Sequence, residues 1–284
     1  MLAPKFWYPE NNEKSFSSLA LVPFGHIYSL LSKLRMSKAV KKQFDIPIVC
    51  IGNLNAGGTG KTPTTISAAQ FLRDRKYNVH IVSRGYGGNA MGPLSVNDKE
   101  HSADDVGDEA LMLSAFAPTW VATKRSDGIQ SAIKEGADII LLDDGFQDPS
   151  VYKDLSILTV NAKKGFGNNR CIPAGPLREK LRNGLERADV LISIGTETSQ
   201  KTFKSIYKSY INMPLVIANL EVLNTGLSLE NMKVLAFAGI AHPENFFDTL
   251  RAQGAEIVDY QALADHQKLS STIMKRLIAG ARAE

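Results

Sequence analysis

A glycine-rich segment directly after an apolar run is the feature that most constrains this chain. The run is residues 46–51, and residues 52–63 then read Gly-Asn-Leu-Asn-Ala-Gly-Gly-Thr-Gly-Lys-Thr-Pro. The apolar run predicts a buried strand, and the Gly-Lys-Thr predicts the start of a helix. Backbone N–H groups of such a loop can surround phosphate oxygens, because glycines carry no Cβ that would collide with them. The segment therefore predicts the phosphate-binding loop of a nucleotide enzyme.

Each position of this loop has an expected role. We expect the loop to bind nucleotide phosphates through Asn55, Ala56, Gly57, Gly58, Thr59, Gly60, Lys61 and Thr62. Lys61 would supply a positive charge, and the Thr62 hydroxyl would face Mg²⁺. The helix that begins at Thr62 would add the partial positive charge of its N-terminus. Asn55 stands where the usual pattern has its first glycine. A chance Gly-Lys-Thr on an ordinary loop is the alternative interpretation.

The composition is that of a globular protein with one large or two smaller domains. The chain has 284 residues, of which 44% are hydrophobic and 22% charged. Its net charge of +4 does not argue for a nucleic-acid partner, and no obligate protein partner is evident. The two cysteines have neither disulfide nor metal-ligand spacing. No apolar run approaches the roughly 20 residues of a membrane span, and no signal peptide is evident. We expect a protein of the cytosol or of a membrane surface.

The first forty residues differ from the rest. Apolar residues at positions 24, 27, 28, 31 and 34 recur with helical spacing after Pro23, a residue suited to a helix start. A basic cluster lies within and after this stretch: Lys33, Arg35, Lys38, Lys41 and Lys42. An apolar stripe beside basic residues is typical of a helix lying on an anionic membrane. A helix packed on its own domain is the alternative, and composition does not decide between the two.

Short apolar strands alternate with helical segments over most of the remaining chain. The expected strands are 46–51, 79–82, 137–142, 155–160 and 190–194, and the expected helices are 63–75, 107–117 and 126–135. This alternation predicts an α/β fold with a P-loop NTPase-like parallel sheet and helices on both faces. After a change of rhythm near residue 212, strand 215–222 would link to a smaller second α/β domain with strands 233–239 and 255–259 around helix 243–253. The expected divisions are 1–42 (membrane-associating helix), 43–212 (phosphate-loop core) and 213–284 (linker strand and second domain).

An acidic pair follows the expected strand 137–142. Asp143 and Asp144 would lie at the tip of that strand and serve a Mg²⁺ site with Thr62. Two adjacent carboxylates in a cleft repel each other unless a cation is present. A turn or helix cap is the alternative, and the phosphate loop favours the metal site.

Other residues near strand ends are candidates for the chemistry. Asp108 and Glu109 begin an expected helix, where they could simply complement its dipole, or Asp108 could act as the base for an acceptor hydroxyl. His242 follows a strand of the second domain and could assist that base or be structural. Arg84 lies in a second glycine-rich loop, residues 83–88, where parallel sheets place ligands. Arg178 lies at a proline-rich turn suited to phosphate, or in a surface ion pair.

These segments together closely resemble one family, the tetraacyldisaccharide 4′-kinases (lipid A 4′-kinases) of Gram-negative bacteria. The matching pieces are residues 4–8, 52–63, 83–88, 106–110, 143–147, 172–179, 238–243 and 265–266. They occur in the family's order and cover nearly the whole chain. The resemblance implies a lipid kinase that transfers a phosphoryl group from ATP to the 4′-hydroxyl of a tetraacyldisaccharide 1-phosphate. It also implies two α/β/α domains and an enzyme peripheral to the cytoplasmic face of the bacterial inner membrane.

The resemblance also implies residue roles. Lys61 and Thr62 would bind ATP and Mg²⁺, Asp143 and Asp144 would serve the metal site, and Asp108 would be the base assisted by His242. Lys61 is thus expected to be catalytic as well. The expected substrate contacts are Arg84, Glu109, Gln147 and Arg178. The family reading also favours the membrane interpretation of the N-terminal helix, because the acceptor lies in a bilayer.

Two departures from the family pattern stand out. Asp148 occupies a position where many relatives have His, and the Thr-Glu-Lys-Asp segment usual in relatives is absent before Glu284. We therefore expect a second domain that is short at its C-terminus. The main rival is a membrane-associated ATPase switch of the partitioning or targeting type, but Ala56 stands where such proteins carry a signature lysine. A catalytically silent lipid-binding module is the third possibility.

Overall fold

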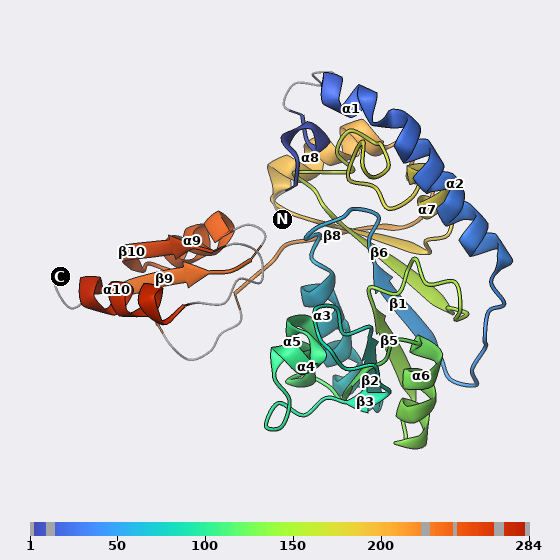
Figure 1. Ribbon diagram of the computed structural model, residues 1–284, viewed down its shortest axis with the longest axis horizontal. Helices are drawn as coiled ribbons and strands as arrows, with labels where there is room; N and C mark the ends of the chain where they lie inside the picture. The colour runs from blue at the N-terminus through green and yellow to red at the C-terminus, as the bar shows by residue number, and fades with distance from the viewer. Residues whose placement is uncertain (1–2, 10–14, 223–227, 241–242, 264–269, 282–284) are drawn as a thin grey trace. The chain divides into compact units, whose positions relative to one another are not determined.

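The chain forms two compact units, one of residues 4–220 and one built on residues 221–284. A computed structural model describes residues 3–9, 15–222, 228–240, 243–263 and 270–281 (Figure 1). His242 and the Asp265-His266 pair lie outside these described residues. The assignment of separate roles to residues 1–42, 43–212 and 213–284 stays a prediction.

An eight-stranded sheet forms the centre of the first unit, in the order β3-β4-β2-β5-β1-β6-β7-β8. Among the described strands, the short edge strand β3 is antiparallel to β4, and the other neighbouring pairs are parallel. The strands are β1 (Ile48–Gly52), β2 (Val79–Ser83), β3 (Leu94–Ser95), β4 (Thr119–Val121), β5 (Ile139–Asp143), β6 (Leu155–Asn161), β7 (Val190–Ile194) and β8 (Leu215–Ala218). The expected strand 215–222 thus includes the edge strand β8, which pairs with β7.

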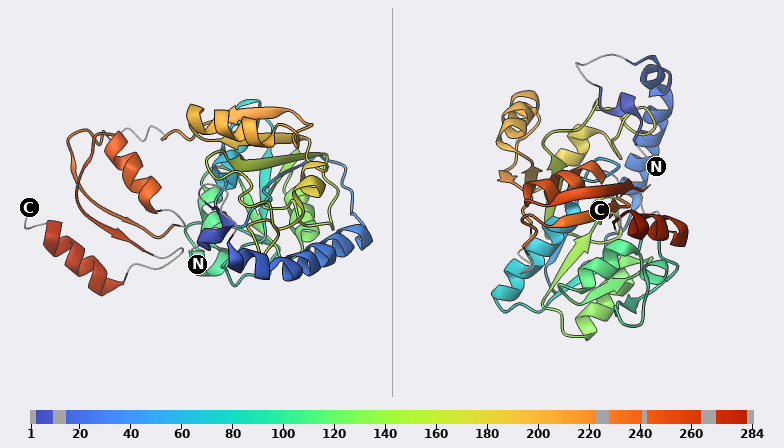
Figure 2. Two further views of the ribbon diagram at one scale, coloured as in Figure 1. Left: turned by 90° about the horizontal axis from the view of Figure 1, so that it is seen from above. Right: turned by 90° about the vertical axis from the view of Figure 1, so that its left-hand side faces the viewer.

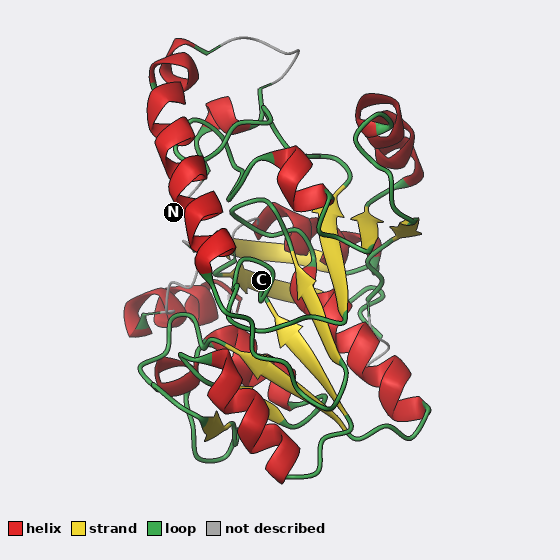
Figure 3. Ribbon diagram, turned by 90° about the vertical axis from the view of Figure 1, so that its right-hand side faces the viewer, coloured by secondary structure: helices red, strands yellow, loops and turns green. Residues whose placement is uncertain are grey.

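Helices cover both faces of this sheet, as Figure 3 shows. They are α3 (Lys61–Asp74), α4 (Ala103–Val106), α5 (Asp108–Ser114), α6 (Arg125–Lys134), α7 (Leu181–Leu185) and α8 (Glu197–Tyr207). The central strand β5 is buried on both sides: Ile139 and Leu141 pack with α3 and α5, and Ile140 and Leu142 with α6. Such two-sided burial explains the continuous apolar runs of the sequence. The predicted α/β fold with a mostly parallel sheet is confirmed.

The expected helix 107–117 corresponds to α5, and a separate short helix, α4, precedes it. Gly107 separates α4 from α5 with a φ of +87°, and a Cβ there would lie 2.4 Å from the carbonyl oxygen of Tyr86. The short α4 was not predicted. Its start is a capping box between Ser102 and Asp105, a signal that the sequence does contain.

The N-terminal region packs on the first unit through small side chains. It comprises η1 (Lys5–Trp7), α1 (Phe16–Ala20) and α2 (Val22–Lys38), which run along the outside of the unit (Figure 2). Ser18, Gly25 and Ser29 are buried, and a Cβ at Gly25 would lie 2.9 Å from the carbonyl oxygen of Cys171. The large apolar residues of these helices face away from this contact, and they are Phe16, Leu19, Phe24, Ile27, Tyr28, Leu30, Leu31 and Leu34. The helices therefore bury their small residues and expose their large apolar ones.

The second unit is small. Strands β9 (Lys233–Ala238) and β10 (Glu256–Ala262) pair in parallel, with helices α9 (Pro243–Ala252) and α10 (Ser271–Ala281). Its buried core contains Ala236, Ala238 and Phe247. These elements match the expected strand-helix-strand order of the second α/β domain.

Candidate active site

The glycine-rich loop connects β1 to α3 at the carboxyl edge of the sheet. Gly57 and Gly60 have φ angles of +119° and +87°, which favour glycine. A Cβ on Gly57 or Gly58 would meet nothing within 4 Å, so this part of the loop borders open space. Asn53 holds the loop closed, because its Nδ2 donates to the Thr59 hydroxyl at 2.8 Å and to the Gly57 carbonyl at 3.2 Å. The backbone can therefore approach a phosphate group closely.

The first two loop positions are bonded to neighbouring segments. Asn55 is buried, and its Nδ2 donates to the Gly165 carbonyl at 3.1 Å and to the Tyr8 hydroxyl at 3.3 Å. The N–H of Ala56 donates to the Pro176 carbonyl at 2.7 Å. In this conformation the N–H of Ala56 is already used. Residues 57–62 are therefore better placed to bind phosphate than Asn55 and Ala56, which were also expected to do so.

The two aspartates at the end of β5 have different environments. Asp143 is buried: its Oδ1 accepts from the Thr65 hydroxyl at 3.1 Å, and its Oδ2 has no hydrogen-bond partner among the described residues. Burial and, to a smaller extent, the nearby charges of Glu109 and Asp144 together raise the pKa of Asp143 to about 7. Thr65 and the charge of Lys61 therefore compensate an ionised Asp143 only in part, which suits a carboxylate that receives a cation.

Asp144 is compensated by basic side chains. Both of its oxygens accept from Arg178 NH1, at 2.8 and 2.9 Å, and Lys61 Nζ lies 3.9 Å from Oδ1. Burial alone would raise the pKa of Asp144, but the charges of Lys61 and Arg178 lower it below its ordinary value. The structure therefore brings together a loop lysine, a strand-tip aspartate and an arginine from the proline-rich turn.

A polar network extends from Arg178. Gln147 accepts from Arg178 NH1 at 3.3 Å and donates from Nε2 to the Asn53 carbonyl at 2.9 Å and to Glu179 Oε1 at 3.1 Å. The buried Glu179 also accepts from Arg187 NH2 at 2.6 and 2.7 Å. Gln147 and Arg178 were expected as substrate contacts, and the structure places both beside Asp144 and the phosphate loop.

Three further predicted residues, Arg84, Asp108 and Glu109, belong to segments of the same unit. Glu109, on the first turn of α5, is close enough to Asp143 to raise its pKa. Asp108 is the first residue of α5, as expected. Arg84 follows β2 and is exposed. The loop after Arg84 bonds to the α4 helix, since the Asn89 and Ala90 N–H groups donate to the Asp104 and Asp105 carbonyls at 3.0 and 2.8 Å.

The donors at this edge fit Mg²⁺. No group of three or more His, Cys, Asp or Glu side chains that could hold a metal lies within the described parts of the chain. A full protein cage is not needed, because Mg²⁺ is usually held by one or two carboxylates together with waters and phosphate oxygens. Asp143, with a buried oxygen that has no partner there, and the buried Thr62 meet this requirement.

Comparison with known proteins assigns the chain to a family. The sequence model of the family described as tetraacyldisaccharide-1-P 4′-kinase matches residues 17–284. The chain belongs to this family. The resemblance inferred from the sequence motifs is thereby confirmed.

Individual members of the 4′-kinase family are similar along nearly the full chain. The tetraacyldisaccharide 4′-kinase of Jannaschia sp. (strain CCS1) is 49% identical over 281 residues, which cover 99% of this chain and 85% of that protein. The tetraacyldisaccharide 4′-kinase of Dinoroseobacter shibae is 45% identical over 285 residues, which cover 100% of this chain and 85% of that protein. The crystal structure of LpxK from Aquifex aeolicus in complex with ATP is 26% identical, with a TM-score of 0.74, and covers 90% of this chain and 84% of that one.

Sequence reasoning missed two charged residues of this 4′-kinase site. Glu179 lies in a recognised motif but was not assigned a role. Arg125 begins α6, and its guanidinium bonds to the carbonyls of Asp143 and Asp144 and to Asp148. Its position directly after β4, at the carboxyl edge of a parallel sheet, was an available signal. Asp148, the departure from the family pattern, is thus an ion-pair partner.

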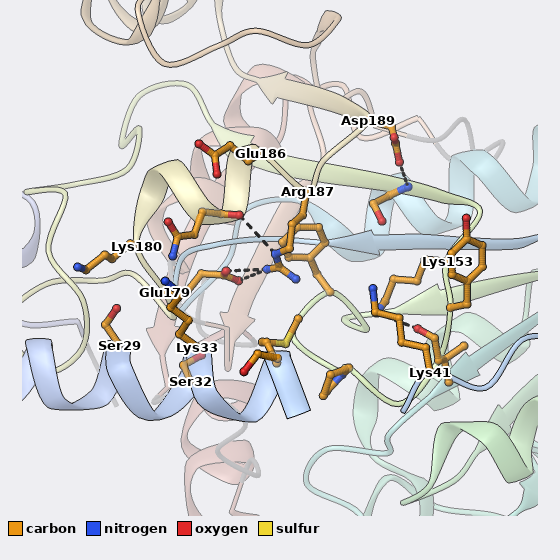
Figure 4. Close-up of a pocket in the computed structure, with 18 of the residues that line it drawn as sticks. Ser29, Ser32, Lys33, Lys41, Lys153, Glu179, Lys180, Glu186, Arg187 and Asp189 are labelled. Carbon is orange, nitrogen blue, oxygen red and sulfur yellow. Dashed lines mark hydrogen bonds and ion pairs between the residues drawn. The ribbon is translucent and has the colours of Figure 1, made fainter. Parts of the chain in front are cut away.

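A cavity of about 560 Å³ adjoins the site and is lined on one side by α2 (Figure 4). Residues of α2, α7 and the segment 149–156 line it, and Figure 4 shows Arg187 reaching across to Glu179. Glu179 belongs both to the cavity wall and to the polar network. The charged residues that line the cavity are Lys33, Lys41, Lys153, Asp154, Glu179, Lys180, Glu186, Arg187 and Asp189.

Proposed function

We propose that this protein is a lipid kinase, which transfers the γ-phosphoryl group of ATP to the 4′-hydroxyl of a tetraacyldisaccharide 1-phosphate in lipid A biosynthesis. Its membership of the tetraacyldisaccharide-1-P 4′-kinase family supports this activity. The single observation that carries the proposal is the convergence of Lys61, Asp144 and Arg178 beside the phosphate loop. A cluster of two cations and a carboxylate at that loop suits the charge of a transferring phosphoryl group.

Separate groups of residues would bind the phosphates, hold Mg²⁺ and orient the acceptor. The backbone of residues 57–62 would bind phosphate oxygens, and Lys61 and Arg178 would neutralise the charge that they carry. Thr62, Asp143 and Asp144 would hold Mg²⁺, which supplies further charge neutralisation when bound. Asp108 would orient the acceptor hydroxyl and take its proton, assisted by His242. Arg84, Glu109, Gln147 and Arg178 are the proposed substrate contacts.

The N-terminal helices support association with a membrane surface. Phe16, Phe24 and Leu31 are 84%, 60% and 61% exposed, although each is large and apolar. Exposed apolar surface of this extent marks an interaction site, and a basic segment beside it favours anionic lipid. None of the described helices is long and apolar enough to cross a membrane. We therefore propose peripheral binding at the cytoplasmic face of the bacterial inner membrane, where the acceptor's acyl chains would lie.

A direct transfer assay tests the proposal. The purified protein is incubated with γ-labelled ATP, Mg²⁺ and disaccharide 1-phosphate in detergent, and the lipid products are separated. Label in a bisphosphorylated lipid is the expected result, and a Lys61→Ala variant provides the matched control. ATP hydrolysis without any transfer to lipid would refute the kinase assignment and favour an ATPase switch.

A further inference from the structure

Arg125 contacts the backbone of the acidic pair from a buried position. It is the first residue of α6 and only 4% exposed. Its NH2 donates to the Asp144 carbonyl at 2.8 Å and to the Asp143 carbonyl at 3.3 Å. One side chain therefore holds the two consecutive peptide groups that carry the aspartates of the proposed metal site.

The held segment has an unfavourable backbone conformation. Asp144 has a φ of +49°, in the left-handed region that residues with a Cβ rarely adopt. This turn directs the Asp144 carboxylate to Arg178 and Lys61, while the carboxylate of Asp143 bonds to Thr65 on α3. The hydrogen bonds from Arg125 stabilise the turn, so they help to set where both carboxylates lie.

Asp148 neutralises and orients the same guanidinium. Its Oδ2 lies 3.0 Å from Arg125 NH1, and its Oδ1 accepts from the Ser150 hydroxyl and N–H at 2.6 and 3.0 Å. Burial alone would raise the pKa of Asp148, but the bonds from Ser150 and the charge of Arg125 lower it. Asp148 is therefore ionised at neutral pH. Its carboxylate holds NH1 of Arg125, while NH2 donates to the carbonyls of Asp143 and Asp144.

We propose that Arg125 and Asp148 form a positioning pair, which holds the Asp143–Asp144 turn in the conformation needed to bind Mg²⁺ with ATP. The inference rests on the proposed kinase site, and neither residue is assigned contact with substrate. Residues that orient metal ligands commonly change metal affinity or activity by about 10–100-fold when they are replaced. An effect of that size on the Mg²⁺ requirement is expected here.

A double variant separates positioning from stability. In Arg125→Met with Asp148→Leu, both charges are removed together, and such apolar replacement of a buried pair is often neutral or stabilising. The carbonyls of Asp143 and Asp144 nevertheless lose their donor. The control for a loss of stability alone is Phe203→Leu, at a buried core residue whose ring packs with those of Phe166 and Tyr207 and has no hydrogen bond to the acidic pair.

Three quantities are measured on each purified variant: the melting temperature, the Mg²⁺ concentration that half-saturates ATP binding by calorimetry, and kcat with KM for lipid phosphorylation. The double variant is expected to melt near the wild type, to need about 10–100-fold more Mg²⁺ and to lose kcat by a similar factor. Phe203→Leu should lower the melting temperature and leave the Mg²⁺ requirement within about twofold.

Two results would overturn the inference. One is a double variant with the wild-type Mg²⁺ requirement and kcat, which would make the pair merely structural. The other is an equal change in Phe203→Leu, which would attribute the effect to stability. Failure of the kinase assignment is separately visible, since the wild type would then bind ATP with Mg²⁺ and transfer nothing to lipid.

Discussion

Replacing Asp143 by Asn should stabilise the ligand-free protein while removing its activity. The Asp143 side chain is 1% exposed, and its Oδ2 has no hydrogen-bond partner in the described part of the chain. Ionisation at this position is costly, because burial and then the charges of Glu109 and Asp144 raise its pKa to about 7. An Asn side chain is neutral at every pH and its oxygen can still accept from Thr65.

The size and the sign of the effect follow from proton linkage. An unfolded Asp has a pKa of about 3.9, so the unfolded state releases its proton first as pH rises. Between about pH 4 and pH 7 the native state binds more protons than the unfolded state, and stability falls as pH increases. At about 1.4 kcal/mol per pKa unit, the cost is about 1.5 kcal/mol at pH 5 and about 4 kcal/mol at pH 8.

Denaturant unfolding in chelator-containing buffer measures this cost. The free energy of unfolding of Asp143→Asn, relative to the wild type, should increase by about 2–3 kcal/mol between pH 5 and pH 8. Adding Mg²⁺ with ATP should then stabilise the wild type more than the variant, which is expected to be inactive. The exposed Asp98→Asn substitution is the control, and it should leave the pH dependence unchanged. Equal pH dependence of the free energy of unfolding in wild type and Asp143→Asn would show that Asp143 does not titrate in this range.

Three further predictions concern the proposed mechanism. Lys61→Ala should lower kcat by at least about 100-fold with an unchanged melting temperature, as measured by lipid phosphorylation and thermal unfolding. Asp108→Ala should lower kcat by about 100-fold or more, and near-normal turnover of the folded variant would exclude Asp108 as the base. Phe24→Glu with Leu31→Glu should abolish cosedimentation with anionic vesicles, because each apolar side chain contributes roughly 1.5–3 kcal/mol when buried. The exposed Phe71→Glu on α3 serves as its control, and equal loss of vesicle binding there would contradict the assignment of the α1–α2 face.

The regular part of the fold was predictable because it depends on local patterns. The apolar runs of β1, β5, β6 and β7 and the helices α3 and α6 appear within one or two residues of their expected positions. The phosphate loop was also predictable from its glycines. The structure gives Gly57 and Gly60 positive φ angles, which favour that residue type. The short helix α4 before Gly107 was missed, although the capping box of Ser102 and Asp105 at its start is a local signal.

The burial of the N-terminal helix could not be predicted from its composition. Its apolar stripe fitted both a membrane surface and a protein core. Only the packed structure reveals that Ser18, Gly25 and Ser29 form the buried face, which leaves the large side chains exposed. That outcome depends on the close approach of Gly25 to Cys171, a contact between distant parts of the chain.

The α/β architecture, the phosphate loop and the family follow from the amino-acid sequence alone, because periodicity and motif spacing are properties of short segments. The distribution of charges within the site depends instead on long-range packing. In the folded chain Asp144 pairs with Lys61 and Arg178, and one oxygen of Asp143 has no partner among the described residues. The Arg125–Asp148 ion pair contacts the backbone of both aspartates. Those pairings join residues up to 83 positions apart, counted from Lys61 to Asp144, so only the folded chain brings them together.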